Sequence, residues 1–174
     1  KYGAKAPFFR SEKTSNDYAG IAEVAAEVLE EYKEEFTYFC IIFATAPFIT
    51  HERLIEGYKL VKEKKFSSVF PVRKFSYPIQ RALELKNHKV SMIWSENYTK
   101  RSQDLTSAYH DSGQFYWVNT AEFLKEKKVF MENSGAIILS DLEVQDIDTT
   151  EDWELAEMKY RILFYRKNQL IQQE

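Results

Sequence analysis

The sequence has little of several things that would point to particular protein classes. It contains one cysteine, Cys40, and only 5 glycines and 4 prolines in 174 residues. One cysteine excludes an internal disulfide framework and a cysteine-rich zinc site. No apolar run approaches the roughly 20 residues of a membrane-spanning helix, and the first residues lack a signal-peptide pattern. The net charge is only −3, so no general positive field would recruit nucleic acid or an anionic membrane. These absences predict a soluble cytoplasmic protein with no nucleic-acid or membrane partner.

What remains is the composition of a globular protein rich in aromatic residues: 44% hydrophobic, 29% charged and 16% aromatic. A chain of this length fits one domain and can bury a substantial core. Cys40 lies within the apolar run YFCIIFA, which favours a buried structural thiol over a reactive one.

The first half of the chain alternates helical and strand patterns. Apolar residues at helical spacing predict a helix over Ile21–Tyr32, and Thr50 can cap a second helix. The continuous apolar run Tyr38–Ala44 predicts a strand buried on both faces, as in parallel sheets. Ser67–Val72 is a further predicted strand, in which Pro71 indicates a bulge or an edge. The alternation favours an α/β fold with a mostly parallel, Rossmann-like sheet.

The second half begins with a β-rich insertion at about residues 83–118. Its first part is a predicted hairpin turning at Asn87 and His88, followed by an irregular polar and aromatic stretch. The remaining pattern predicts strands at QFYWV, Gly135–Ser140 and Val144–Asp148, a short helix over Thr120–Lys127, and a last helix from Thr149 or Thr150 to about Tyr165. Asp152 stands in a capping-box-like position of that last helix.

The stretch RSQDLTSAYHDSGQFYW, residues 101–117, is too polar for a core and too aromatic for a solvated loop. Arg101 offers a planar fork for a carboxylate or a phosphate, and Gln103 can both donate and accept hydrogen bonds. The alternative is a polar network that ties the insertion to its own core. Ser107, His110 and Asp111 do not indicate a hydrolase triad, because no nucleophile elbow accompanies them.

A second candidate site is the acidic pair in QDIDTTEDW. Asp146 and Asp148 lie two residues apart on a predicted strand, so their carboxylates would leave the same face. Two converging carboxylates suit a hard divalent cation whose coordination shell is completed by phosphate. The alternative is an acidic turn in which Asp148 merely caps the last helix.

Five stretches in order resemble the sugar-acid cytidylyltransferases, in particular their pseudaminic acid branch: YGAKAPFFRSEKTSNDYAG, IIFATAPFI, FSYPIQRAL, MIWSENYTKRSQDLTSAYHDSGQFYW and VQDIDTTEDWELAE. They span nearly the whole chain, and RSQDL followed by YHDSGQFYW is the most specific. The related sialic acid enzymes have a different sequence there. The resemblance implies a nucleotide-diphospho-sugar transferase fold and an enzyme that joins a nine-carbon acidic sugar to CMP. It also implies CTP as the donor, Mg²⁺ as the cofactor and a product used in cell-surface or flagellar glycosylation.

The resemblance also implies roles for individual residues. Asp146 and Asp148 would hold the metal against the triphosphate, and Arg101 would act with them in catalysis while facing the sugar acid beside Gln103. Further sugar contacts are expected at Gln80, Arg81, Tyr109 and Gln114, and a nucleotide contact at Arg10.

One element of the family pattern is not found. These enzymes open with a strand and a Gly-, Ser-, Lys- and Arg-rich loop that wraps the triphosphate, whereas KYGAKAPFF indicates the end of a helix closed by Gly3. We therefore expect a single cytidylyltransferase domain, residues 1–174, whose N-terminal loop segment is not represented, so this chain alone could be inactive. Two alternatives stay open: a non-catalytic nucleotide-sugar-binding module on the same scaffold, and a cytidylyltransferase for another sugar acid such as N-acetylneuraminic acid.

The insertion also predicts a homodimer. Between Ser91 and Phe123 it carries more aromatic residues than a small hairpin can bury, namely Trp94, Tyr98, Tyr109, Phe115, Tyr116 and Trp117. Such residues are enriched in interface cores. The alternative is that these rings pack onto their own sheet. Related cytidylyltransferases dimerise through an insertion at this place, so the resemblance implies the same assembly.

Overall fold

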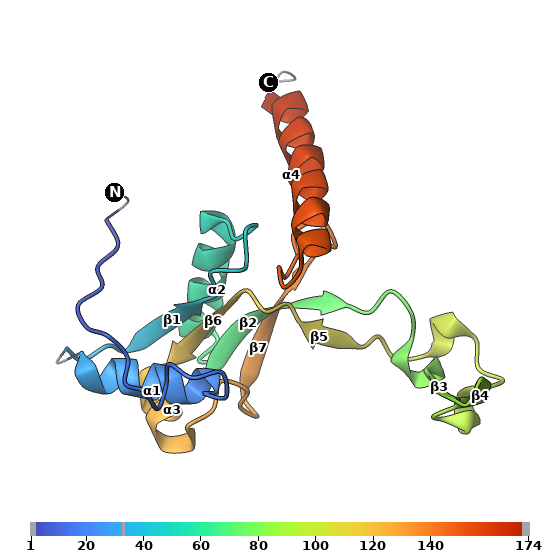
Figure 1. The fold of residues 1–174 in the computed structure, drawn as a ribbon, viewed down its shortest axis with the longest axis horizontal. Coiled ribbons are helices and arrows are strands. Elements are labelled where there is room, and N and C mark those ends of the chain that lie inside the picture. The colour runs from blue at the N-terminus through green and yellow to red at the C-terminus, as the bar shows by residue number, and fades with distance from the viewer. Residues whose placement is uncertain (1–2, 33, 172–174) are drawn as a thin grey trace. The chain divides into compact units, whose positions relative to one another are not determined.

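A computed structural model of the chain describes residues 3–32 and 34–171, with side chains as far as residue 165. Its helices and strands are, in order, α1 (Ile21–Glu31), β1 (Tyr38–Ile42), α2 (His51–Glu63), β2 (Ser68–Lys74), β3 (Leu83–Lys86), β4 (Lys89–Met92), β5 (Tyr109–Asp111), β6 (Phe115–Asn119), α3 (Thr120–Glu126), β7 (Ser134–Leu139) and α4 (Thr150–Ile171) (Figure 1). The chain forms two compact units. The first contains residues 1–44, 49–70 and 114–137, and the second contains residues 45–48, 71–113 and 138–174.

Strand β6 is the centre of the first unit. It pairs antiparallel with β1 along its whole length and with the start of β2. Phe115 and Val118 of β6 are fully buried. On the Trp117 face the strand contacts α2, where the indole Nε1 donates a hydrogen bond to the Leu54 carbonyl oxygen at 2.9 Å. On the opposite face α3 packs against the sheet, with the rings of Phe123 and Phe39 5.2 Å apart. Helices therefore cover both faces of this sheet, as in an α/β fold.

The α/β class is confirmed, but the mostly parallel order of strands is not. The three pairings of established register in the larger sheet, β1 with β6, β2 with β6 and β2 with β5, are all antiparallel. Strands β1 and β2 run in the same direction, yet β6 lies between them. The sequence pattern missed this because QFYWV resembles a buried parallel strand in composition, and composition carries no information about direction.

The prediction that Tyr38–Ala44 is buried on both faces is wrong. Strand β1 ends at Ile42, its residues are half-buried, and the Ile42 side chain is 53% exposed. β1 is the end strand of the described order, so only β6 pairs with it. Cys40 was predicted to be a structural thiol and not a reactive one. Burial raises the pKa of its thiol to about 12, which keeps the thiol protonated at neutral pH and agrees with that prediction.

Strand β2 changes partner at Pro71. Ser68 and Val69 pair with β6, whereas the stretch from Val72 to Lys74 pairs with β5. Proline lacks a backbone N–H, so it fits where the ladder is interrupted. Its carbonyl oxygen still accepts hydrogen bonds from the backbone N–H and the hydroxyl of Ser112, at 3.1 and 2.9 Å. The edge predicted at this proline is wrong, because β2 pairs with β5, β6 and β7, and what occurs at Pro71 is a change of partner.

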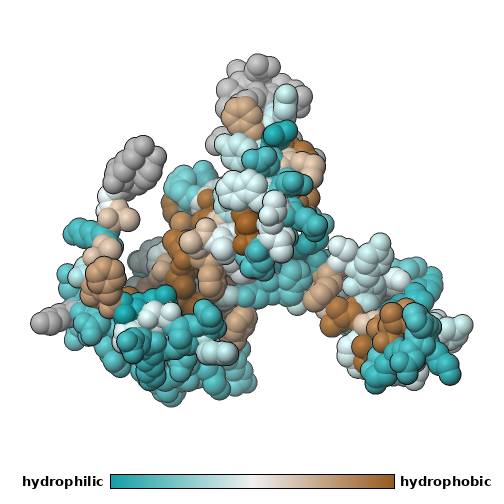
Figure 2. Space-filling view, in the orientation of Figure 1, coloured by the Kyte–Doolittle hydropathy of each residue, from teal (hydrophilic) through white to brown (hydrophobic). Residues whose placement is uncertain are grey.

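The second unit contains the predicted hairpin. Strands β3 and β4 pair antiparallel, and the turn residues Asn87 and His88 both have positive φ, 49° and 63°. Two left-handed residues form the tight turn that matches the twist of a hairpin. The hairpin leaves apolar side chains in solvent, including Leu85 at 70% exposure and Val90 at 59%. In Figure 2 brown, apolar atoms lie on the surface of the region that contains the hairpin, at the right of the view.

The predicted strand over Val144–Asp148 is wrong, because residues 141–149 have no regular structure. The predicted capping box of α4 is confirmed. The Asp152 carboxylate accepts from the Thr149 N–H at 2.9 Å, and the Thr149 hydroxyl accepts from the Asp152 N–H at 3.2 Å. These bonds fix the start of the helix, which continues to Ile171 rather than to Tyr165. No helix among the described residues is long and apolar enough to cross a bilayer.

Gly57 of α2 offers a test of this packing. A Cβ atom at Gly57 would lie 2.8 Å from Cδ1 of Trp117 and 3.1 Å from Cε2 of Phe115. Trp117 cannot yield without losing its hydrogen bond to Leu54. Overpacking costs about 1–3 kcal/mol, which exceeds the gain in helix propensity of up to about 1 kcal/mol. We expect Gly57→Ala to lower the free energy of unfolding by about 1 kcal/mol in urea denaturation, whereas the exposed Lys59→Ala should change it little. A more stable Gly57→Ala variant would contradict this packing.

Candidate active site

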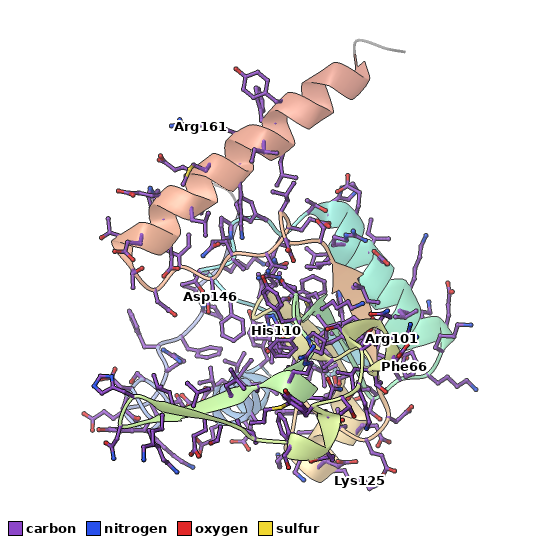
Figure 3. All side chains as sticks on the ribbon, turned by 90° about the vertical axis from the view of Figure 1, so that its right-hand side faces the viewer. Phe66, Arg101, His110, Lys125, Asp146 and Arg161 are labelled. Carbon is purple, nitrogen blue, oxygen red and sulfur yellow. The ribbon has the colours of Figure 1, made fainter. Side chains whose placement is uncertain are left out.

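The acidic pair lies on the irregular segment that leads into α4 (Figure 3). Asp146 and Asp148 are both exposed. The Asp146 Oδ1 atom accepts from the N–H of Ile147 at 3.1 Å, and its Oδ2 atom lies 3.8 Å from the position of a Cβ at Gly113. Among the described residues, no group donates a hydrogen bond to the Asp148 carboxylate, so Asp148 does not cap α4.

Asp152 takes the capping role instead. Its Oδ2 atom accepts from the N–H groups of Asp148 and Thr149 and from the Thr149 hydroxyl, at 3.3, 2.9 and 2.7 Å. These bonds, the Thr149 hydroxyl first, hold the pKa of the Asp152 carboxyl below its usual value. Because the cap is already occupied by Asp152, the Asp148 carboxylate is available for another partner.

The donor set fits a hard divalent cation that keeps part of its coordination shell. Mg²⁺ is usually held by one or two carboxylates together with phosphate oxygens and water. Asp146 and Asp148 supply two such carboxylates. Among the described residues there is no cluster of three or more side chains that could hold a metal ion. The two carboxylates therefore fit a cation whose remaining ligands are phosphate oxygens and water. They do not fit a cation held by protein ligands alone.

Arg101 starts a short 3-10 turn, residues 102–104, in the second unit. Its Nε and Nη2 atoms donate to the two carboxylate oxygens of Asp104, at 2.7 and 3.0 Å. Both side chains are exposed, 71% and 48%. An exposed pair of this kind contributes about 0–1 kcal/mol, so it orients the guanidinium more than it stabilises the fold. One nitrogen, Nη1, stays outside the pair and can bind an anion.

Gln80 and Arg81 lie on a second 3-10 turn, residues 79–81, that contacts the Arg101 region. Gln80 Nε2 donates to the Thr106 carbonyl oxygen at 2.9 Å, and Arg81 Nη1 donates to the Ser102 hydroxyl at 3.3 Å. The Gln80 Oε1 atom is buried without a hydrogen-bond partner. An open cleft of about 600 Å³ lies beside Arg81 and Ser102, lined also by Tyr77, Pro78, Ile79, Ala82, Leu83, Met92 and Tyr98. The structure thus brings Gln80 and Arg81 against the stretch that carries Arg101.

The other predicted residues are less closely grouped. Gln103 is exposed, and Tyr109 of β5 is 43% exposed opposite Lys74 of β2. Gln114 is only 2% exposed and belongs to the first unit, as does Arg10, which is exposed. Their contact with a ligand stays a prediction.

The loop after Arg10 is tied to α1 by one carboxylate. Glu27 accepts hydrogen bonds from Ser11 N–H and Oγ, at 2.5 and 2.8 Å, and from the Thr14 hydroxyl at 2.5 Å. These bonds, the Thr14 hydroxyl first, lower the pKa of the Glu27 carboxyl, and the charge of Arg10 acts in the same direction. The geometry around Arg10 is therefore set by Glu27, which the sequence pattern shows only as one acid among several on α1.

A polar network is present around Asn97, which lies before the stretch 101–117 for which the alternative interpretation predicted one. Asn97 is 6% exposed; its Nδ2 donates to the Gln80 carbonyl oxygen at 3.3 Å and its Oδ1 accepts from Lys100 Nζ at 2.9 Å. Sequence analysis missed Asn97, because a buried asparagine in a polar stretch leaves no pattern. His110 Nδ1 bonds to the Asp111 carbonyl oxygen, 2.8 Å away, which agrees with the absence of a triad.

Comparison with known proteins shows which family the chain belongs to, although no family model matches it. The chain is 38% identical over 166 residues to the pseudaminic acid cytidylyltransferase of Campylobacter jejuni serotype O:2, covering 93% of this chain and 72% of that protein. The chain belongs to the pseudaminic acid cytidylyltransferase family. As a member of that family it is also similar to the N-acylneuraminate cytidylyltransferase of Escherichia coli O18:K1:H7, with 27% identity over 90% of this chain and 39% of the relative. A flagellin modification protein B of Campylobacter coli is 25% identical over 90% of this chain and 68% of its own length.

Proposed function

We propose that this protein transfers a cytidylyl group from CTP to a nine-carbon acidic sugar, pseudaminic acid, releasing pyrophosphate. The observation that carries the proposal is the 38% identity over 93% of the chain to a pseudaminic acid cytidylyltransferase. In the reaction the anomeric hydroxyl oxygen bonds to the α-phosphorus of CTP while the bond to the pyrophosphate oxygen breaks. The hydroxyl proton leaves to a base or to water. Similarity to a flagellin modification protein supports a role of the product in flagellar or cell-surface glycosylation.

Asp146 and Asp148 would hold a Mg²⁺ ion against the triphosphate. When bound, that ion neutralises negative charge that grows on the phosphate oxygens and the leaving pyrophosphate. The two carboxylates are exposed on the segment before α4, which leaves space for a nucleotide to approach them.

The sugar acid would bind beside Arg101. Its carboxylate would be held by the guanidinium, whose Nη1 stays outside the Asp104 pair. The neighbouring cleft at Arg81 and Ser102 combines apolar walls with a polar edge, which suits a deoxy sugar bearing acylamino groups.

The sheet would be Rossmann-like, and the protein would act in the cytoplasm, where CTP is made. That β1 and β2 run in the same direction supports this arrangement.

The test is an assay of the full-length protein with CTP, Mg²⁺ and each candidate sugar. We expect CMP-sugar and stoichiometric pyrophosphate with pseudaminic acid, and much less with N-acetylneuraminic acid. A preference for N-acetylneuraminic acid would support the alternative specificity. Binding of CMP-sugar without turnover of either sugar would identify a non-catalytic module and contradict the proposal.

We also propose a homodimer formed through the insertion. The aromatic residues that motivate it divide into two groups. Phe115 and Tyr116 are buried in their own sheet and Trp117 packs against α2, as the alternative held. Trp94, Tyr98 and Tyr109 are instead 40%, 73% and 43% exposed. With the exposed face of the β3–β4 hairpin they supply exposed apolar side chains of the kind that interfaces bury.

Light scattering on the full-length protein checks the assembly, and we expect a dimer at micromolar concentration. Tyr98→Asp together with Leu85→Asp should shift it toward monomer, while the exposed double change Lys59→Asp and Lys62→Asp on α2 should not. An active monomer of the unchanged protein would contradict both the dimer and any sugar site shared between subunits.

A further inference from the structure

Lys159, in the third turn of α4, makes contacts that packing alone does not explain. Its Nζ atom donates hydrogen bonds to the Val144 carbonyl oxygen at 2.7 Å and to Gln145 Oε1 at 2.9 Å. Both acceptors are neutral, and both come directly before Asp146 in the chain. The lysine therefore connects the helix to the segment that carries the acidic pair.

Holding an ammonium group there costs free energy. Lys159 is half-buried, and desolvation, followed by repulsion from Arg73, lowers its pKa, with Asp141 acting in the opposite direction. Arg73 Nε donates to Asp141 Oδ1 at 2.6 Å, so that carboxylate is already engaged. A methionine would pack against the same surface without the desolvation cost. The two hydrogen bonds that Lys159 donates are thus what distinguishes it from an apolar residue at this place.

Gln145 extends the connection to Asp146 and to the helix cap. Its Nε2 atom donates to the Asp146 carbonyl oxygen at 2.9 Å and to Asp152 Oδ1 at 3.2 Å. Asp152 in turn binds the Asp148 N–H. Asp152 and Lys159 are seven residues apart, two turns along α4, and so lie on the same face of the helix. The backbone on both sides of the acidic pair is therefore tied to one helix face.

We propose that Lys159 is a positioning residue which, through Gln145, holds the Asp146 and Asp148 carboxylates in the arrangement that a divalent cation requires. This rests on the metal role of the two aspartates in the proposed function. The segment has no strand ladder to fix its backbone, so the directions of the carboxylates depend on these side-chain bonds. Losing groups that orient metal ligands typically costs 10–100-fold in metal affinity or activity.

The test uses Lys159→Met in the full-length protein with CTP present and the sugar acid absent. Mn²⁺ is the probe and its EPR signal is the readout, compared with the signal of Mn²⁺ and CTP without protein. We expect about tenfold weaker Mn²⁺ binding and a similar rise in the Mg²⁺ concentration for half-maximal velocity. The KM for the sugar acid should stay within about twofold, because the sugar contacts are untouched. Lys159→Arg keeps two donors and should restore most of the Mn²⁺ affinity. Arg161→Met removes a 73% exposed cation from the same helix and serves as the matched control.

Unchanged Mn²⁺ affinity in Lys159→Met, with only a lower Tm, would mean that the lysine is a helix anchor and would overturn the proposal. Should that variant fail to fold, Gln145→Leu breaks the same connection without altering α4, and the same weakening is expected. The parent assignment is tested separately with Asp148→Asn. If Asp148→Asn binds Mn²⁺ with the affinity of the unchanged protein, the proposed metal site is wrong. If Asp148→Asn loses Mn²⁺ binding while Lys159→Met keeps it, only the role of Lys159 is wrong.

Discussion

Replacing Asp148 with Asn should lower kcat at saturating Mg²⁺ by about 100-fold or more while leaving the fold intact. A cation that stabilises phosphate charge contributes several kcal/mol in the transition state, and each 1.36 kcal/mol corresponds to about tenfold in rate. The Asp148 side chain is exposed, and its contact with the helix cap runs through its backbone N–H. We therefore expect the free energy of unfolding to change by less than about 0.5 kcal/mol.

The measurement is pyrophosphate release across a range of Mg²⁺ concentrations, with circular dichroism to follow the fold. Asp141→Asn is the control, because it removes a carboxylate from the same segment, where Asp141 pairs with Arg73. Asp141→Asn should retain most of the activity. Near-normal turnover of Asp148→Asn at ordinary Mg²⁺ would reduce the acidic pair to a solvated turn.

Sequence patterns predicted the local elements of this protein better than their arrangement. The Asn87–His88 turn and the Thr149–Asp152 capping box depend on residues close in the chain, and both are present. The antiparallel position of β6 and the exposure of β1 depend on which strands become neighbours. No local pattern contains that information, since apolar runs look alike in parallel and antiparallel strands.

The acidic pair shows the same limit within the candidate site. Alternation in VQDID predicted a strand that would align the two carboxylates, but the segment is irregular and is held by Lys159, Gln145 and Asp152. Period-2 spacing within five residues is weak, because a few polar side chains can fix the same backbone in another form. The metal role of the aspartates stays a prediction that rests on the resemblance, on their exposure and on their donor type, because the shared face was derived from that strand.

Replacing Arg101 with Ala should raise the KM for the sugar acid far more than the KM for CTP. A hydrogen bond to a charged group contributes about 1.5–3 kcal/mol, which corresponds to roughly a 10–100-fold weaker interaction with the sugar carboxylate. Stability should change little, because the pair that Arg101 forms with Asp104 is exposed. Steady-state kinetics with each substrate varied in turn, at saturating concentrations of the other, gives both constants.

Asp104→Asn separates binding from loop structure, because it weakens the same pair but leaves the guanidinium in place. If Arg101 binds the sugar carboxylate, Asp104→Asn should leave the KM for the sugar unchanged or lower it, since a competing anion has been removed. Arg101→Lys keeps the charge without the planar fork and should recover only part of the loss. If Asp104→Asn raised the KM for the sugar as much as Arg101→Ala does, the Arg101–Asp104 pair would only hold the loop in place. A rise in the KM for CTP rather than for the sugar would show that Arg101 faces the nucleotide, and the two subsites would have to be exchanged.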